Sequence, residues 1–290
     1  MTLRALVFGG TGLLGRAVTT EARRRGLAAL ALSHAQGDVT DRERVLYWAD
    51  AFRPTLVVNC AALTRVDDCE SEVEGATAVN GEAVGHLVEA ARRVDARLLH
   101  LSTDYVFDGG GVRPYREDDA TAPASVYGRS KLVGEEHALA YEKSLVVRTS
   151  WLFGPGGPNF VATMVRLIRE GRTPLRVVDD QHGCPTYAPF LARALWLLAE
   201  IEARGVVHYR NRGPVTWCGF AREIAQLWDN STEVVPVTTE EFPRPAPRPA
   251  YSVLDVERFE TLVGRRVEPW GLGLIEYLAS HRTTPGGRRG

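Results

Sequence analysis

One glycine-rich turn near the start of the chain limits the folds available to this sequence. The turn reads Gly9-Gly10-Thr11-Gly12-Leu13-Leu14-Gly15. It follows an apolar, strand-like segment at residues 3–8 and opens a helical pattern at residues 13–25. Glycines in such a turn let the backbone approach a pyrophosphate, and the helix N-terminus adds N–H donors and a positive dipole end. A G-x-x-G-x-x-G spacing is weak alone, but this strand–turn–helix context indicates a dinucleotide site.

Strand-like and helix-like segments alternate through the first half of the chain. We expect strands at residues 3–8, 28–32, 56–62, 97–102 and 144–149. We expect helices at residues 13–25, 44–52, 73–94 and 127–139. Short apolar strands separated by helices predict a parallel sheet that is covered on both faces. Right-handed crossovers then make the fold class α/β, with a Rossmann-like, doubly wound parallel sheet.

The composition of the sequence changes after residue 149. Glycine and proline become frequent there, and residues 236–249 hold several prolines. We therefore expect two domains, with a ligand cleft at their junction. The NAD(P)-binding domain covers residues 1–149 plus a returning segment at about 174–204, whose helix at 187–203 packs back on it. A smaller, discontinuous C-terminal substrate domain covers 150–173 and 205–282. Residues 283–290 are expected to form a flexible tail.

Composition excludes several classes of function. The 290 residues carry 35 basic and 36 acidic side chains, a formal net charge of −1, so nothing draws the chain to nucleic acid or to an anionic membrane. No apolar run approaches the roughly 20 residues that span a bilayer, and the N-terminus lacks a signal-peptide pattern. The four cysteines are scattered without C-x-x-C spacing. We expect free thiols and a cytoplasmic protein.

Three residues indicate the chemistry. Tyr127 and Lys131 stand one helical turn apart, so the phenol and the ammonium share a face. A free phenol has a pKa of about 10, and a fixed positive charge beside it is expected to bring that pKa toward neutral pH. Thr103 ends a predicted central strand, at the sheet edge that lines the ligand crevice. Its hydroxyl can orient a substrate carbonyl and the Tyr127 oxygen. With the dinucleotide site, Thr103, Tyr127 and Lys131 predict hydride transfer with Tyr127 as the acid.

The second strand helps to choose the cofactor. An acidic residue at its end would bind the ribose hydroxyls of NAD and repel the phosphate of NADP, but here the strand ends in Ser33-His34. NADPH is favoured, and NADH stays open. Arg16 can meet a phosphate, with a solvated surface arginine as the alternative. Asp38 and Val39 suit a contact with the adenine edge, with a loop-capping aspartate as the alternative.

Longer motifs resemble a known family. The runs that carry the resemblance are Gly10-Thr11-Gly12-Leu13-Leu14-Gly15, Asn59-Cys60-Ala61-Ala62, Ser102-Thr103-Asp104-Tyr105-Val106-Phe107-Asp108-Gly109, Val126-Tyr127-Gly128, Arg148-Thr149-Ser150-Trp151, Asp180-Gln181-His182-Gly183-Cys184-Pro185-Thr186 and Arg248-Pro249-Ala250-Tyr251-Ser252. They resemble the extended short-chain dehydrogenase/reductase superfamily that acts on nucleotide sugars, and within it the dTDP-4-dehydrorhamnose reductase family. The resemblance extends from the glycine turn to Trp270.

The resemblance implies roles for particular residues. The cofactor would be bound by Gly9, Thr11, Gly12, Leu13, Leu14, Gly15, Asp38, Val39, Ala61, Ala62, Leu63, Thr64, Tyr127 and Lys131. The substrate would be bound by Val66, Thr103, Asp104, Tyr105 and Trp151. Asn80 resembles a helix asparagine with a structural role or a place in a proton relay, and we favour the structural role. The implied activity is NAD(P)H-dependent reduction of the 4-keto group of a dTDP-linked 4-keto-6-deoxysugar.

Some family features are missing, and some alternatives stay open. Some family members carry a glutamate after the glycine turn, linked to a magnesium-bound dimer contact, whereas this chain has Arg16 and Ala17. We predict no metal and leave a homodimer open. The alternatives are a nucleotide-sugar epimerase or dehydratase, or a non-catalytic NADP-binding regulatory subunit. Dehydratases of this superfamily resemble T-D-E where this chain has Tyr105, and the sugar itself is not identified.

Overall fold

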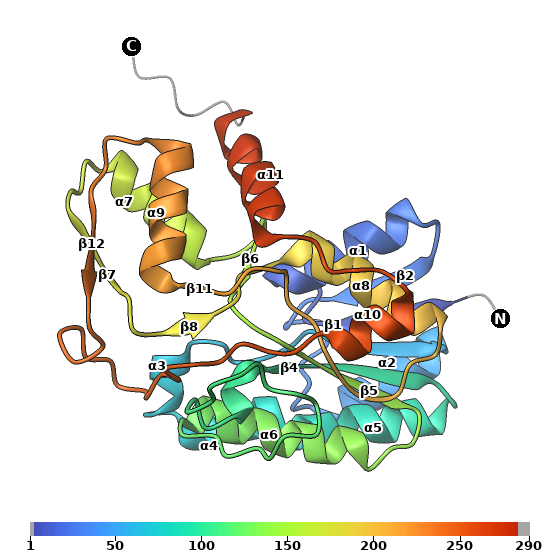
Figure 1. The fold of residues 1–290 in the computed structure, drawn as a ribbon. Helices are drawn as coiled ribbons and strands as arrows, with labels where there is room; N and C mark the ends of the chain where they lie inside the picture. Colours follow the sequence, from blue (N-terminus) through green and yellow to red (C-terminus); the bar gives the residue numbers. More distant parts are fainter. Residues whose placement is uncertain (1–2, 284–290) are drawn as a thin grey trace.

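A six-stranded parallel sheet forms the centre of the molecule. The computed structural model describes residues 3–283 (Figure 1). The strand order is β10-β5-β4-β3-β1-β2, and all neighbours run parallel. The strands are β1 (Arg4–Phe8), β2 (Ala28–Leu32), β3 (Leu56–Asn59), β4 (Arg97–Thr103), β5 (Ser144–Thr149) and β10 (Gly205–His208). The predicted α/β class with a doubly wound parallel sheet is confirmed.

Helices cover both faces of this sheet (Figure 1). One face packs against α1 (Leu13–Arg24), α8 (Ala188–Glu200) and α10 (Glu257–Val263). The other packs against α2 (Arg42–Phe52), α5 (Ala83–Arg93) and α6 (Val126–Leu139). The helix expected to return to the first domain is α8, and its Trp196 Nε1 donates to the Val18 carbonyl oxygen over 3.0 Å. Both faces of the strands are therefore buried, as continuous apolar strands require.

A second lobe lies at the upper left of Figure 1, beyond the carboxyl edge of the sheet. Its short strands pair in twos: β7 (Leu175–Val178) with β12 (Val234–Val237), β8 (His182–Gly183) with β11 (Val215–Thr216), and β6 (Leu152–Phe153) with β9 (Thr186–Tyr187). Its helices are α7 (Phe160–Arg169), α9 (Trp217–Trp228) and α11 (Trp270–Thr283). They enclose a separate apolar core that includes Phe153, Phe220 and Tyr277.

Some segments lie elsewhere than the sequence boundaries place them. β10 belongs to the large sheet, where Gly205 is in register with Leu145, although residues 205–282 were expected in the substrate domain. β7 pairs with β12 in the second lobe, although residues 174–204 were expected in the first domain. A four-residue strand carries no sign of which sheet it joins, since its partner is distant in sequence. α7 was not expected at all. The two-domain division itself stays a prediction.

Two expected elements are interrupted. The helix expected at 73–94 is α4 (Val73–Thr77), a π-helical turn η1 (Ala78–Glu82) and then α5. π-helical turns inside helices often mark functional sites, and this one turns Asn80 inward. The strand expected at 56–62 ends at Asn59, because the Asn59 side chain accepts from the Ala61 amide over 3.0 Å and bends the chain away. The short helices α3 (Val66–Cys69) and η2 (Asp104–Val106, 3₁₀) follow β3 and β4.

Several expectations concern the chain as a whole. The expected tail lies outside the described residues, except for Thr283, which ends α11. All four cysteines are free thiols. Within residues 3–283, no helix combines the length and apolar character needed to cross a membrane. In that same part of the chain, no group of three or more His, Cys, Asp or Glu side chains is arranged for a metal ion. The absence of a metal stays a prediction.

Candidate active site

The glycine turn can be built only from glycine at two positions. Gly9 has a φ of +70°, and a Cβ there would lie 2.6 Å from the Ala61 amide nitrogen. A Cβ on Gly15 would lie 2.2 Å from the Gly9 carbonyl oxygen. Gly12 is the N-cap of α1 and has no side chain that would fill the space in front of the helix. The sequence therefore builds a bare helix N-terminus that suits a pyrophosphate.

A cavity of about 220 Å³ lies at this turn, along the carboxyl ends of β1, β2 and β3. Its lining is Gly9, Thr11, Gly12, His34, Gly37, Asp38, Val39, Cys60, Ala61, Ala62 and Val79. Bare backbone, small side chains and one carboxylate fit an adenosine and its phosphates. The residues expected to bind the cofactor that do not line this cavity are Leu13, Leu14, Gly15, Leu63, Thr64, Tyr127 and Lys131.

Four lining residues were not among the sequence candidates. His34 and Gly37 belong to the loop after β2, and Cys60 directly follows β3. Their position just after a parallel strand is the signal that could have found them. Val79 reaches the cavity from the π-helical turn, and no pattern in the sequence marks it.

Asn80 fixes the loop that follows β3. Its buried side chain accepts from the Leu63 amide over 2.8 Å and donates to the Leu63 carbonyl oxygen over 3.1 Å. It also donates to the Ser130 hydroxyl over 3.0 Å. The amide thus ties the Leu63 segment to α6. These contacts support the structural role that the sequence favoured for Asn80.

Thr103 and Tyr127 meet at the end of β4. Thr103 is the last residue of that strand, and Tyr127 lies in the first turn of α6. Ser125 caps α6 by accepting from the Gly128 amide over 3.1 Å, which sets where the helix begins. Burial raises the pKa of Tyr127 well above its usual range, and a hydrogen bond with Thr103 opposes that rise. The phenol is therefore held protonated at neutral pH.

Lys131 lies in the same helix, and its ammonium contacts residues of β4. Its Nζ donates to the Leu101 carbonyl oxygen over 2.6 Å and lies 3.4 Å from His100 Nε2. Burial lowers the pKa of Lys131 to about 8. The expected lowering of the Tyr127 pKa by this ammonium is not seen here: burial of the phenol raises that pKa, and Lys131 is directed to the Leu101 carbonyl oxygen instead. The one-turn spacing brings the side chains to one face, but it does not decide which partner each one takes.

Asp104 and Tyr105 continue from Thr103 into η2. Asp104 is 2% exposed, and burial raises the pKa of its carboxyl to about 7, although the Thr103 hydroxyl donates to it over 3.1 Å. The Tyr105 ring packs edge-on against the Tyr127 ring, with 5.7 Å between centroids. Asp104 and Tyr105, which were expected to contact the substrate, therefore lie directly beside Thr103 and Tyr127.

Trp151 leaves β5 at the same sheet edge, since Thr149 is in register with Thr103. Its φ of +42° is strained for a bulky residue. The Trp151 ring stacks on Trp217 and closely approaches Gly183, where a Cβ would lie 2.4 Å from Trp151 Cε2. Gly183 and Trp217 were not predicted as site residues. Residue 183 of the D-Q-x-G run must be glycine, because the Trp151 indole occupies the space that a side chain there would fill.

The segment that follows the proline-rich stretch joins the two lobes over this site. The Tyr251 amide donates to the Gly109 carbonyl oxygen over 3.0 Å, and the Ser252 amide donates to the His182 carbonyl oxygen over 2.8 Å. Close by, Arg248 pairs with Asp67 over 2.9 Å, next to Val66 at the start of α3. Motifs far apart in the sequence thus meet at one place.

The fold and the site define a class of protein. This class is the NAD(P)-dependent oxidoreductases with a Rossmann-like domain. Its features here are the bare glycine turn, the nucleotide cavity, and the Thr103–Tyr127–Lys131 group at one edge of the sheet. Residues 3–283 match the family described as RmlD substrate binding domain, and the chain belongs to this family. The resemblance found from sequence motifs is confirmed.

Named relatives cover nearly the whole chain. A dTDP-4-dehydrorhamnose reductase from Streptomyces griseus is 46% identical, over 94% of this chain and 92% of that protein. A dTDP-4-keto-6-deoxy-D-glucose reductase from Streptomyces niveus is 40% identical, over 95% of this chain and 96% of that protein. The crystal structure of dTDP-4-dehydrorhamnose reductase from Bacillus anthracis in complex with NADP superposes with a TM-score of 0.92 at 34% identity, covering 97% of this chain and 100% of that one.

Proposed function

We propose that this chain reduces the 4-keto group of a dTDP-linked 4-keto-6-deoxysugar, with NADPH as reductant and Tyr127 as proton donor. The observation that carries the proposal is the placement of Thr103, the last residue of β4, beside the first turn of α6, which carries Tyr127, with Lys131 one turn further along that helix. The family membership and the names of the relatives support the reaction and the kind of substrate.

The protein's own residues supply orientation and a proton. The nicotinamide, when bound, supplies the hydride that reaches the carbonyl carbon. Thr103 donates a hydrogen bond to the carbonyl oxygen and holds the Tyr127 phenol beside it. Tyr127 transfers its proton to the oxygen as negative charge develops there. Its raised pKa suits this direction of reaction, because the phenol must begin protonated.

Lys131 has two tasks in this proposal. Its ammonium stabilises the phenolate that Tyr127 becomes after the proton has left. It would also donate to the nicotinamide ribose, while the Leu101 carbonyl keeps the side chain directed along β4. The remaining cofactor contacts would come from the glycine turn to the pyrophosphate, from Asp38 and Val39 to adenosine, and from residues 61–64 along the dinucleotide.

The substrate would lie between the two lobes. Asp104 and Trp151 would contact the sugar nucleotide, and Val66 and Tyr105 would line the site. Tyr105 argues against a dehydratase. Elimination of water needs a second carboxylate beside Asp104. Tyr105 stands at that position, and burial raises the pKa of its phenol, so it cannot replace a carboxylate. An epimerase would need a further acid or base, whereas a reductase needs only Tyr127.

The test is NADPH oxidation by the purified protein with dTDP-4-keto-L-rhamnose and, separately, with dTDP-4-keto-6-deoxy-D-glucose. We expect turnover with at least one of them. Tyr127→Phe should lower kcat by about 10²–10⁴-fold and leave NADPH affinity unchanged. Tyr47→Phe, at a phenol that is 63% exposed, is the matched control.

Two results would contradict the proposal. Full turnover by Tyr127→Phe would remove Tyr127 from its role as acid. NADPH binding without turnover of either sugar nucleotide would favour the non-catalytic subunit, even though Thr103, Tyr127 and Lys131 are all present.

A further inference from the structure

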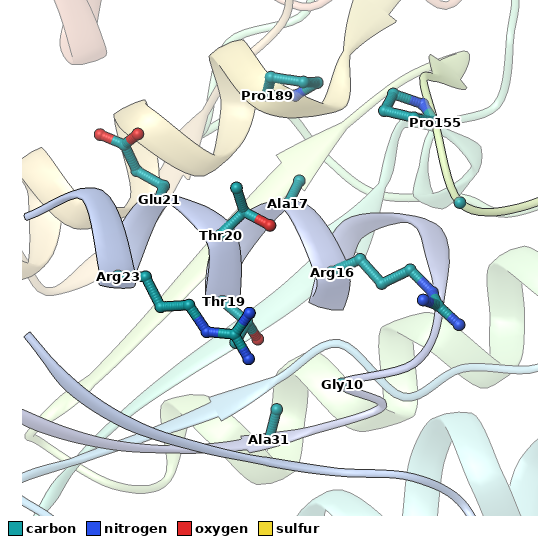
Figure 2. Close-up of a pocket in the computed structure, with 11 residues that line it drawn as sticks. Gly10, Arg16, Ala17, Thr19, Thr20, Glu21, Arg23, Ala31, Pro155 and Pro189 are labelled. Carbon is teal, nitrogen blue, oxygen red and sulfur yellow. The ribbon is translucent and has the colours of Figure 1, made fainter. Parts of the chain in front are cut away.

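A second, larger cavity of about 430 Å³ lies on the other side of the glycine turn (Figure 2). Its lining is Gly10, Arg16, Ala17, Thr19, Thr20, Glu21, Arg23, Ala31, Pro155, Gly156 and Pro189. Apart from Gly10 in the glycine turn, the proposed mechanism uses none of these residues. Gly10 belongs to the same turn as Gly9, Thr11 and Gly12, which line the nucleotide cavity. The two cavities therefore adjoin at the turn.

Arg16 is held at the junction of the two cavities. Its Nε donates to the Thr11 carbonyl oxygen over 2.7 Å, which places the guanidinium beside the turn. Gly156, with a φ of +98°, packs on the Arg16 stem, because a Cβ there would lie 2.7 Å from Arg16 Cδ. An arginine has five N–H donors, and among residues 3–283 Arg16 has no carboxylate partner. Its remaining donors are available to a ligand.

The charge around Arg16 is positive and uncompensated. Arg16 and Arg23 both extend toward the segments that carry Gly10 and Ala31 (Figure 2). Glu21 is the one carboxylate in the lining, and it is already paired with Arg24 and Arg25. β2 ends at Leu32 and is followed by Ser33 and His34, so no acidic side chain directly follows that strand. A planar, fixed guanidinium without a counter-charge is suited to a phosphate group.

We propose that Arg16 binds the 2′-phosphate of NADPH and so selects NADPH over NADH. The inference rests on the proposed dinucleotide cofactor and adds the residue that would recognise its phosphate. Arg23 lies seven residues further along α1, about 10 Å away at the rise of an α-helix. It shares the cavity but lies too far from the turn to contact the same phosphate. Arg23 therefore contributes only a weak, screened attraction.

The test compares two ligands that differ only in the 2′-phosphate, adenosine 2′,5′-bisphosphate and adenosine 5′-monophosphate. Binding is measured by titration calorimetry at fixed ionic strength for the wild type, Arg16→Ala, Arg16→Lys and Arg23→Ala. We expect the wild type to prefer the bisphosphate and Arg16→Ala to lose about 10–100-fold in bisphosphate affinity, the range for a charge-assisted hydrogen bond. Arg16→Lys should keep part of the preference, and Arg23→Ala should change it less than about twofold.

Unchanged binding of adenosine 5′-monophosphate by Arg16→Ala would show that the variant folds and that its nucleotide cavity is intact. A wild type without preference for the bisphosphate would overturn the proposal. So would an Arg16→Ala variant that keeps the preference, or equal losses in Arg16→Ala and Arg23→Ala. No keto sugar takes part in this titration, so failure of the proposed reductase activity would leave its result unaffected.

Discussion

The indole rings of Trp151 and Trp217 lie parallel, with 3.6 Å between their centroids and 9° between their planes. Trp151 carries a positive φ, a strain that persists only where the surroundings enforce it. Trp217 begins α9 in the second lobe, and its ring also packs against Phe160. The second lobe therefore holds in place a proposed substrate residue, Trp151, which lies in the connection between β5 and β6.

Removing this stack should weaken substrate binding selectively. An aromatic pair is worth about 0.5–1.5 kcal/mol beyond its buried area. We expect Trp217→Ala to raise KM for the sugar nucleotide by about 3–10-fold while KM for NADPH stays constant, because Trp151 loses its support. Trp217→Phe should recover most of the loss, and Trp228→Phe at the other end of α9 is the control. Steady-state kinetics that showed equal rises in both KM values would contradict the role.

The lowered pKa of Lys131 predicts a limit to activity at alkaline pH. Burial favours the neutral amine, so the ammonium is present below a pH of about 8 and is lost as the pH rises through that value. We expect kcat/KM to fall above about pH 8 in the wild type. Lys131→Arg should be slower but should lack this fall, because a guanidinium stays charged. The surface variant Lys143→Arg should keep the wild-type pH profile, and a profile unchanged in Lys131→Arg would argue against the assignment.

The raised pKa of Asp104 predicts a pH dependence of stability. The folded state holds the Asp104 proton up to a pH of about 7, whereas the ordinary pKa of this carboxyl is 3.8. The folded chain therefore binds more protons in this window, and the free energy of unfolding falls as the pH rises from about 4 to 7. Asp104→Asn should remove this fall and be more stable than the wild type at pH 8, by an amount of the order of 1–3 kcal/mol.

Thermal unfolding at pH 5 and pH 8 measures this difference. Asp119→Asn is the control, because the Arg113 guanidinium lowers the pKa of Asp119 to about 2. That carboxylate stays ionised over the whole window, so its variant should show the same change in stability at both pH values. A stability difference between Asp104→Asn and wild type that did not depend on pH would refute the prediction.

Asn80 should contribute to stability and to cofactor binding together. Asn80→Ala leaves the amide and carbonyl of Leu63 without their partner in a buried region. Each unsatisfied buried group costs about 1–3 kcal/mol, so we expect a loss of about 2–4 kcal/mol in urea unfolding and a weaker affinity for NADPH. Asn230→Ala, at an exposed turn, should change neither. An unchanged urea midpoint for Asn80→Ala would show that the Leu63 loop does not depend on it.

Local patterns predicted the part of the fold that depends on neighbours in sequence. The bounds of β2 and β5 agree with the expected strands, and the glycine turn stands between β1 and α1 as expected. Two further features could be predicted because each depends on a single element. They are the one-turn spacing of Tyr127 and Lys131 and the position of Thr103 at the end of a strand. These features predicted the class of enzyme before any contact was known.

Other features depend on residues that are distant in sequence. Packing between separate elements determines which sheet β10 joins and that Lys131 donates to the Leu101 carbonyl oxygen. It also determines the stacking of Trp151 on Trp217. Burial also reversed the expected direction of the Tyr127 pKa, because desolvation depends on everything that surrounds the phenol.

The sequence by itself determined the alternating α/β order, the dinucleotide turn and the local positions of Thr103, Tyr127 and Lys131, because backbone propensity and helical or strand periodicity act over a few residues. Only the tertiary structure decided that the second lobe supports Trp151 and that the Arg16 guanidinium has no carboxylate partner in the described part of the chain. It also decided the protonation states of the buried groups. Those properties arise from desolvation and from contacts across the fold, and no local spacing encodes them.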